Sequence, residues 1–276
     1  MPEAPGRTER DWLHAGGRAG LWGNLGCWSP GTPDYASACE TLTRLVADAA
    51  GVAAGARVLC LACGAGGELQ WLLAERAVAQ VVGIERDAAL VGLAQRTLPA
   101  GAWRLLHGDA AAPASAALGL APASFDAVLC VDAAYHLRPR EALLRQALQL
   151  LRPGGRLAYT DLSLVPVAGR WRRGLLQAAA ALCGLSAGDL LPAAAQARRL
   201  QGLGFVDVQV QDWSEPVLGG FSRFVRHQAQ RGDGRGWVSA SRRPRWTARL
   251  IGPCRAAGLG YVLLSGRKPP SADATA

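Results

Sequence analysis

Five short apolar runs separated by helical stretches occupy residues 56–161, and this alternation limits the choice of fold more than any other feature. The apolar runs span residues 56–61, 79–84, 103–107, 125–131 and 156–161, and the helical stretches span 68–75, 87–97 and 139–151. Asp87 stands where its side chain can cap the second of these helices. Strands that alternate with helices at this spacing predict βαβ units and a buried parallel sheet. We therefore expect an α/β fold with a doubly wound, Rossmann-like sheet.

The alternation stops after Ser163. Residues 168–202 predict two helices with no strand between them. Two further strands, at 205–210 and 260–266, lie on either side of an arginine-rich stretch, 216–250, in which the spacing predicts one helix. After Ser163 the chain is therefore expected to add two strands to the sheet and a group of helices outside it.

Length and composition narrow the class of protein. The chain has 276 residues and half of them are apolar, which is enough for one large domain with a full core, or for a domain with a cap. No window approaches the roughly 18 uninterrupted apolar residues of a membrane-spanning helix. Glu3, Glu9 and Asp11 precede any apolar stretch, so we expect no secretory signal. Seven cysteines, most of them in apolar runs, predict reduced thiols in a cytoplasmic protein.

The formal net charge is +9, and Lys268 is the single lysine, so arginine carries nearly all of the positive charge. A basic balance is typical of proteins that bind nucleic acid or an anionic membrane. The chain is also rich in Ala, Gly, Arg and Pro and poor in Ile, Lys and Met, as GC-rich coding produces. We favour this second explanation and expect no nucleic-acid partner.

A glycine-rich stretch, "LACGAGG" at residues 61–67, directly follows the first apolar run. Glycines let a backbone approach a ligand closely, and the helix that follows offers free N–H groups to an anion. Any tight turn from a strand into a helix can also use such glycines. Cys60 and Cys63 have the spacing of a zinc pair, but the sequence has no second pair and no histidine cluster, so we expect no metal.

Carboxylates follow the second and third runs. In a doubly wound sheet, ligands bind beyond the carboxyl ends of the strands. Glu85 ends the second run, 21 positions after Gly64, where a carboxylate can accept both hydrogens of a ribose diol. Asp109 follows the third run and either accepts a hydrogen bond from an adenine amino group or belongs to an ordinary Gly-Asp turn.

The fourth run, in "SFDAVLCVDAAYHL", is followed by Asp132, Tyr135 and His136. These side chains are expected beside the ligand position. An unperturbed histidine pKa of about 6.5 suits a general base. The alternative for His136 is that it caps the helix that begins near Pro139.

Taken together, these four segments resemble the class I S-adenosylmethionine-dependent methyltransferases, especially the small-molecule group that includes ubiquinone/menaquinone and tocopherol methyltransferases. The resemblance runs from Ala56 to Asp161 and is carried by "FDAVLC" and "LLRPGGRL" in the expected order. Upstream, "NLGCWSPG" is similar to the aromatic-glycine gate of that group. The resemblance implies a mostly parallel, seven-stranded sheet that is closed by an antiparallel strand and covered by a helical cap.

The resemblance also implies roles for individual residues. The glycine loop would hold the methionine part of the cofactor S-adenosyl-L-methionine, Glu85 the ribose, and Asp109 with Ala110 the adenine edge. The residues expected to bind the cofactor are Ala62, Cys63, Gly64, Gly66, Glu85, Arg86, Asp109, Ala110 and Asp132. The residues expected to contact the substrate are Trp28, Tyr35 and Tyr135, and the catalytic residue is His136.

Two residues depart from the family pattern. Cys60 stands where the family has an acidic residue, and Ala62 stands where it has a glycine. Glu68 is close enough in sequence to replace the missing acid. Loss of one charge-assisted hydrogen bond costs about 1.5–3 kcal/mol and would weaken cofactor binding roughly tenfold or more. A non-catalytic member that binds the cofactor or serves as a scaffold is therefore one alternative.

The expected function is methylation of a small, lipophilic or aromatic acceptor at oxygen or nitrogen rather than at carbon. One alternative is an RNA or protein methyltransferase that uses the arginine-rich stretch Arg223–Arg249, but the sequence lacks a recognisable RNA-binding module. A dinucleotide oxidoreductase would need a G-x-G-x-x-G spacing that is absent here. Peripheral contact with a membrane through the 168–185 helix is a further alternative without a clear basic amphipathic pattern.

We expect four regions along the chain. They are an N-terminal tail with the gate and one helix at 1–50, the cofactor-binding core at 51–165, a helical cap insertion at 166–203, and the closing strands with an arginine-rich lid at 204–270.

Overall fold

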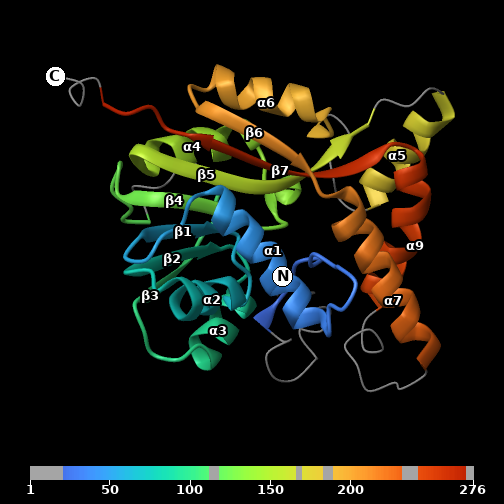
Figure 1. Cartoon of the computed structure of the whole chain (residues 1–276), viewed down its shortest axis with the longest axis horizontal. Coiled ribbons are helices and arrows are strands. Elements are labelled where there is room, and N and C mark those ends of the chain that lie inside the picture. The colour runs from blue at the N-terminus through green and yellow to red at the C-terminus, as the bar shows by residue number, and fades with distance from the viewer. Residues whose placement is uncertain (1–20, 112–117, 166–169, 183–188, 232–241, 272–276) are drawn as a thin grey trace, which may run out of the picture.

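A computed structural model of the chain describes residues 21–111, 118–165, 170–182, 189–231 and 242–271. Its centre is a seven-stranded sheet with the strand order β3-β2-β1-β4-β5-β7-β6 (Figure 1). The strands are β1 (Arg57–Leu61), β2 (Gln80–Glu85), β3 (Trp103–His107), β4 (Phe125–Cys130), β5 (Leu151–Leu164), β6 (Val206–Asp212) and β7 (Leu259–Arg267). Strands β1 to β5 pair in parallel, whereas β7 runs antiparallel to both β5 and β6. This confirms the expected fold class.

Helices cover both faces of the sheet. Helix α1 (Tyr35–Ala49) precedes β1, the helices α2 (Gly67–Arg76), α3 (Ala88–Thr97) and α4 (Arg140–Leu150) follow β1, β2 and β4, and α6 (Ala193–Gly202) precedes β6. One hydrophobic cluster joins α1, α2 and α3 to the sheet, and a second joins α4 and α6 to it. Along β1, Val58 and Cys60 belong to the first cluster, and Leu59 and Leu61 belong to the second. This alternation is the period of two that a strand buried on both faces requires.

Short polar side chains begin two of these helices, as their sequences predict. The carboxylate of Asp34 accepts a hydrogen bond from the Ser37 N–H at the start of α1, and that of Asp87 accepts one from Ala89 at the start of α3. Each carboxylate satisfies one of the backbone N–H groups that a helix leaves free in its first turn.

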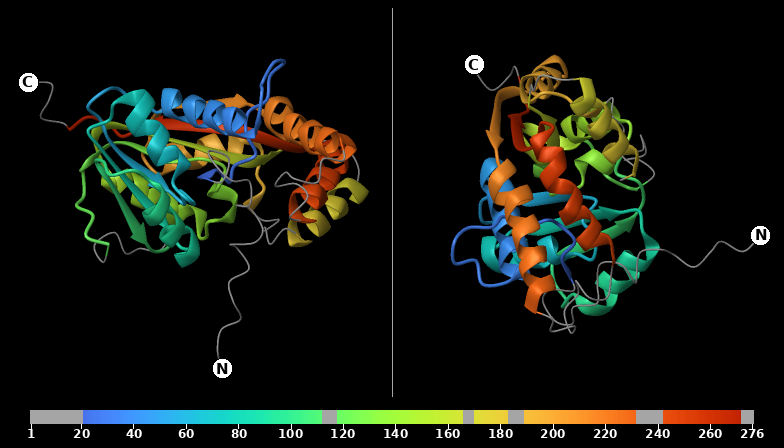
Figure 2. Two further views of the ribbon diagram at one scale, coloured as in Figure 1. Left: turned by 90° about the horizontal axis from the view of Figure 1, so that it is seen from below. Right: turned by 90° about the vertical axis from the view of Figure 1, so that its right-hand side faces the viewer.

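A group of three helices lies beyond the carboxyl end of the parallel strands. It consists of α5 (Arg170–Leu182), α7 (Gly220–Arg231) and α9 (Arg242–Ala256), with the π-helical turn η4 (Glu215–Gly219) directly before α7. Figure 1 shows these helices at one end of the sheet, and Figure 2 shows the same group from two other sides. Buried Leu176 and Ala179 of α5 share a small hydrophobic cluster with Cys254 of α9, whereas Phe221 of α7 and Ile251 of α9 belong to the cluster that also includes the sheet.

Three sequence expectations need correction. The arginine-rich stretch contains a second helix, α9, which the sequence did not predict. Helix α6 was expected in the cap, yet it lies on the sheet, where the Gln196 side chain donates to the Leu162 carbonyl oxygen at 2.9 Å. Strand β5 is also longer than expected, because it already pairs with β4 at Leu151 and includes the "PGG" turn with Gly154 at φ 81°.

Candidate cofactor and acceptor site

The glycine loop leads from β1 into α2 through several residues with positive φ. Ala62, Gly64 and Gly66 have φ values of 55°, 58° and 84°. Such a conformation costs a residue with a Cβ about 1–2 kcal/mol, so Ala62 is strained where glycine would be relaxed. A Cβ added to Gly64 would meet no atom within 4 Å. The loop therefore leaves open space beside Gly64, whereas Cys63 is buried and its N–H donates to the Ile84 carbonyl oxygen at 3.2 Å.

Glu85 ends β2 and is buried beside the glycine loop. Its Oε2 atom accepts a hydrogen bond from the Gly64 N–H, and its Oε1 atom accepts one from the Asp87 N–H, both at 2.9 Å. Each carboxylate oxygen has a second lone pair that these bonds leave available. The carboxylate is thus held in place by the protein and still able to accept the hydroxyl groups of a ribose.

The expected adenine residues follow β3, which lies next to β2. His107 pairs with Glu85 in the register of these strands, and Asp109 lies two residues beyond. Asp109 is exposed, and its Oδ1 atom accepts from the Ala111 N–H at 2.8 Å, while Ala110 is buried. Arg86 is exposed at the end of β2. The Gly-Asp turn expected from the sequence is therefore present. It lies at the end of β3, the position expected for contact with adenine.

Asp132 is the centre of a buried polar network just past β4. Its Oδ1 atom accepts hydrogen bonds from the hydroxyl groups of Tyr135 at 2.8 Å and Tyr261 at 2.7 Å. Its Oδ2 atom accepts from the Leu25 N–H at 2.6 Å, and its own N–H donates to the Thr160 hydroxyl at 2.7 Å. Burial raises the pKa of Asp132 to about 6, although these hydrogen bonds favour the ionised form. The network joins the ends of β4, β5 and β7 to the segment that precedes α1.

That segment, residues 21–34, contains the aromatic-glycine motif and is called the gate below. Tyr35 is buried, and its hydroxyl donates to the Asn24 carbonyl oxygen at 2.6 Å, so it holds the gate. The Trp28 indole N–H donates to the Leu25 carbonyl oxygen at 2.8 Å, and its ring stacks on Phe224 of α7 with centroids 4.3 Å apart. The gate is therefore fixed to the sheet on one side and to the cap on the other.

His136 lies in the short 3-10 helix η2 (Ala134–His136) beside the ring of Tyr135. Desolvation of the imidazole lowers its pKa to about 4, and the guanidinium groups of Arg86, Arg138 and Arg140 act in the same direction. The residue as a whole keeps an exposed surface, so the nearby positive charges are the firmer reason for the downward shift. His136 is thus neutral at pH 7 and able to accept a proton.

The cysteines at the glycine loop are free thiols. Cys60 and Cys63 are both buried, and burial raises the pKa of each thiol. Among the residues that the structure describes, no three His, Cys, Asp or Glu side chains form a group that could hold a metal ion. Within the same residues, no helix combines the length and the apolar character that crossing a membrane requires.

Sequence reasoning missed several residues that build this region. Thr160 and Tyr261 complete the Asp132 network, and Phe224 supports the gate. Thr160 lies one residue before the end of the predicted strand 156–161, which was the one local signal. Tyr261 and Phe224 come from elements more than 90 residues away along the chain, so no local pattern could assign them to the site.

The residues present suit an adenosyl cofactor. The space beside Gly64 admits a ligand against the loop backbone, and the buried carboxylate of Glu85 faces the same loop. Glu68, at the start of α2, is buried with its Oε1 atom lacking any hydrogen-bond partner, so a polar partner is missing there. The structure thus places a hydrogen-bond acceptor at the end of β2 and a carboxyl group with one unpaired oxygen at the start of α2.

Comparison with known proteins finds methyltransferases, in agreement with the resemblance seen in the sequence. A family model described as a methyltransferase domain matches residues 59–159. The erythromycin 3''-O-methyltransferase of Saccharopolyspora erythraea is 28% identical over 214 residues, which are 74% of this chain and 68% of that protein. A ubiquinone biosynthesis O-methyltransferase of Stutzerimonas stutzeri is 31% identical over 115 residues, covering 42% of this chain and 48% of that protein. The match therefore spans about half the length of the ubiquinone enzyme.

A solved structure of the cyclase SpnF superimposes with a TM-score of 0.66, at 24% identity, over 90% of this chain and 87% of that one. At this identity the likeness concerns the fold alone. The family match covers the strands and turns that carry the glycine loop, Glu85, Asp109 and Asp132. Residues 59–159 therefore form a methyltransferase domain, and its homologues among small-molecule methyltransferases support S-adenosylmethionine as the cofactor.

Proposed function

We propose that this enzyme methylates a hydroxyl group on a small, lipophilic or aromatic acceptor that binds between the gate and the cap. The observation that carries the proposal is the aromatic contact of Trp28 with Phe224, which joins gate and cap at the carboxyl end of the sheet. Two relatives are named O-methyltransferases, for erythromycin and in ubiquinone biosynthesis, and both names favour oxygen as the acceptor atom.

The surroundings of this contact are mostly apolar. Val217, Leu218 and Phe221 are buried where η4 enters α7, and they belong to the same hydrophobic cluster as the gate. A lipophilic acceptor that binds here would exchange water for apolar and aromatic surface. The half-buried Tyr135 carries a hydroxyl at the edge of the Asp132 network and supplies a polar contact for orienting the acceptor.

S-adenosylmethionine supplies a methyl group that positive sulfur has already activated. The protein then has to align the acceptor oxygen and remove its proton, and alignment alone is worth several kcal/mol, roughly 7–11 in the best cases. In the proposal, the neutral imidazole of His136 would take that proton as the methyl group passes from sulfur to the acceptor oxygen, which would leave S-adenosylhomocysteine. A pKa near 4 makes His136 a weak base but leaves it unprotonated throughout the neutral pH range.

We also propose that the enzyme acts in the cytoplasm. The six cysteines in the described part of the chain are buried, free thiols, which supports a reducing compartment.

The function can be tested by methyl transfer itself. Purified protein is incubated with isotopically labelled S-adenosylmethionine and a panel of lipophilic phenols, secondary alcohols and amines, and the products are identified by mass spectrometry. We expect label on an oxygen of an apolar member of the panel. Label that appears only on amines, or no label although the cofactor binds, would contradict the proposal.

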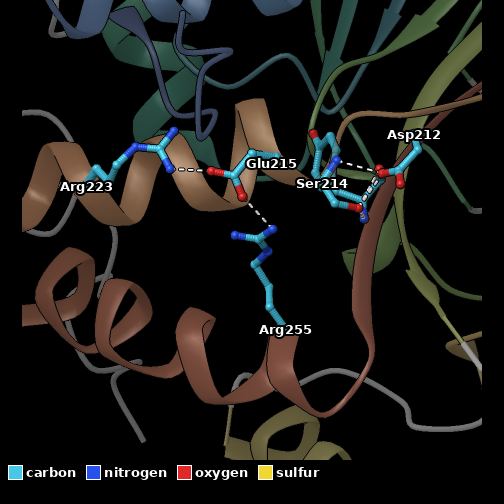
Figure 3. Close-up of polar contacts among 6 residues, drawn as sticks. Asp212, Ser214, Glu215, Arg223 and Arg255 are labelled. Carbon is cyan, nitrogen blue, oxygen red and sulfur yellow. Dashed lines mark hydrogen bonds and ion pairs between the residues drawn. The ribbon is translucent and has the colours of Figure 1, made fainter. Parts of the chain in front are cut away.

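Label on RNA or on bulk protein would instead support the alternative that rests on the arginine-rich stretch. Part of that stretch lies outside the described residues, but two arginines of the region can be placed. Figure 3 shows Glu215 between Arg223 of α7 and Arg255 of α9, and the Arg255–Glu215 ion pair measures 2.5 Å. Both guanidinium groups pair with the same carboxylate, so their charge is partly balanced within the cap.

A further inference from the structure

The carboxyl group of Glu68 is the most unusual titratable group near the cofactor site. Glu68 is the second residue of α2 and its side chain is only 6% exposed. Its carboxyl group contacts the Cys60 thiol at the end of β1, while its Oε1 atom is buried without a hydrogen-bond partner. A buried polar atom left in this state costs about 1–3 kcal/mol. The site therefore lacks a group that would donate a hydrogen bond to Glu68.

The groups around Glu68 show which kind of partner is missing. The titratable groups that face it are Glu85 from β2, Cys60 and Cys63 from the end of β1, and Cys130 from β4. Each of these is either neutral or negative, so none of them supplies a positive charge. Desolvation raises the pKa of Glu68 to about 8, and the nearby charge of Glu85 raises it further. A cation beside this carboxyl group would favour its ionised form and so oppose both the desolvation and the charge of Glu85.

We propose that Glu68 binds the α-ammonium group of the amino-acid end of S-adenosylmethionine. The inference rests on the cofactor assignment above. The open space is at Gly64, in the middle of the loop between β1 and α2, and the unpaired carboxyl oxygen of Glu68 belongs to the first turn of α2, which follows this loop. A ligand whose ribose contacts Glu85 and whose amino acid follows the loop brings its ammonium group to the start of α2. Glu68 thereby replaces a carboxylate that Cys60 cannot provide.

The gate lies against the start of α2. A Cβ added to Gly67 would lie 2.8 Å from the Leu21 carbonyl oxygen and 2.8 Å from the Trp22 ring. We therefore expect the gate to shift from the start of α2 when the amino-acid end of the cofactor enters. Because Glu68 is largely protonated at pH 7 before binding and ionised afterwards, each binding event releases about one proton.

Calorimetry with two ligands tests this inference. S-adenosylhomocysteine carries the amino-acid end, and 5'-methylthioadenosine lacks it. Each is titrated at pH 7 in two buffers of different ionisation enthalpy, into the wild type and into Glu68→Gln. We expect proton release with S-adenosylhomocysteine and the wild type only. Its affinity should fall about 10-fold to 100-fold in Glu68→Gln, as for loss of a charge-assisted hydrogen bond.

Controls separate the outcomes. 5'-Methylthioadenosine should bind both proteins equally without proton release, which also shows that Glu68→Gln is folded. Glu141→Gln removes an exposed carboxylate from α4 and should behave as the wild type. Equal affinity of S-adenosylhomocysteine for wild type and Glu68→Gln, or unchanged proton release, would overturn the role of Glu68. Failure of both ligands to bind the wild type would instead overturn the cofactor assignment.

Discussion

Two backbone N–H groups hold the Glu85 carboxylate, that of Gly64 in the glycine loop and that of Asp87 at the start of α3, one on each oxygen. Glu85→Gln keeps the shape of the side chain but places an NH₂ group against one of these N–H donors. We expect adenosyl ligands to bind about 10-fold to 100-fold more weakly, because charge-assisted hydrogen bonds to the ribose and the loop are lost. Calorimetry with 5'-methylthioadenosine measures this, since that ligand carries the ribose without the amino acid. Unchanged affinity would exclude Glu85 from ribose binding.

His136 makes a prediction about pH. Its pKa is lowered to about 4, so the imidazole is protonated only below that value and is already neutral at pH 6. The pH profile of kcat/KM should therefore show no inflection near the usual histidine value, while His136→Asn should lower kcat about 10²-fold to 10⁴-fold, as for a lost general base. An inflection at about pH 6.5 that His136→Asn removes would contradict the lowered pKa of His136.

At the level of elements, the contact between gate and cap depends on a glycine. A Cβ added to Gly220 at the start of α7 would lie 2.4 Å from the Trp28 Cβ atom. Gly220→Ala should force the gate away from α7 and lower the free energy of unfolding by about 1–3 kcal/mol. In steady-state kinetics, KM for the acceptor should rise, while calorimetry should find unchanged cofactor affinity.

Gly252 provides the matched control for that variant. It lies within α9, and a Cβ added there would meet no atom within 4 Å. Gly252→Ala should leave both KM values unchanged and raise stability by up to about 1 kcal/mol, since alanine favours helix more than glycine does. If Gly220→Ala behaved in the same way, the contact between Trp28 and α7 would not position the acceptor.

A second pair of elements is joined by a buried ion pair. Arg140, the first residue of α4, contacts Asp161 of β5, and the two side chains are 4% and 3% exposed. Asp161→Asn would leave the guanidinium group buried without its counter-charge, which should cost about 3–5 kcal/mol in urea unfolding. The exposed pair Arg145–Glu141 in the same helix is the comparison, and its loss through Glu141→Gln should cost less than about 1 kcal/mol. Equal losses of unfolding free energy in Asp161→Asn and Glu141→Gln would contradict this prediction.

For the whole molecule, Glu68 links stability to pH. Its pKa is raised from 4.5 to about 8 on folding, so the folded protein retains a proton that the unfolded chain releases. Its contribution to stability is therefore present below pH 4.5 and is lost as the pH rises from there towards 8, by at most about 1.4 kcal/mol per pH unit. Glu68→Gln removes this dependence without changing the shape of the side chain.

Thermal unfolding of the protein without added ligand checks the sign of this pH dependence of stability. The difference in Tm between Glu68→Gln and the wild type should move in favour of the variant from pH 5 to pH 8. Asp132 and His136 also titrate below pH 7, but their effects are the same in both proteins and cancel in the difference. A difference that stays constant over this range would mean that Glu68 is already ionised in the folded protein.

The sequence by itself determined the order of strands and helices from β1 to β5 and the positions of the glycine loop, Glu85 and Asp109. These depend on local properties: runs of apolar residues, glycines at a turn, and a carboxylate at a strand end. The capping role of Asp87 was likewise correct, because a helix cap acts over two or three residues. Helix α9 was missed because its arginines and Pro253 obscure helical periodicity, and packing against α5 and α7 stabilises it instead.

Only the tertiary structure decided how the distant parts meet at the site. Tyr261 reaches Asp132 from 129 positions away, and the Leu25 N–H reaches it from 107. It also placed α6 on the sheet rather than in the cap, and left Glu68 buried against Cys60 with an oxygen unpaired. Hydrogen bonding and burial depend on which groups are close in space, and only the packing of the folded chain fixes those distances.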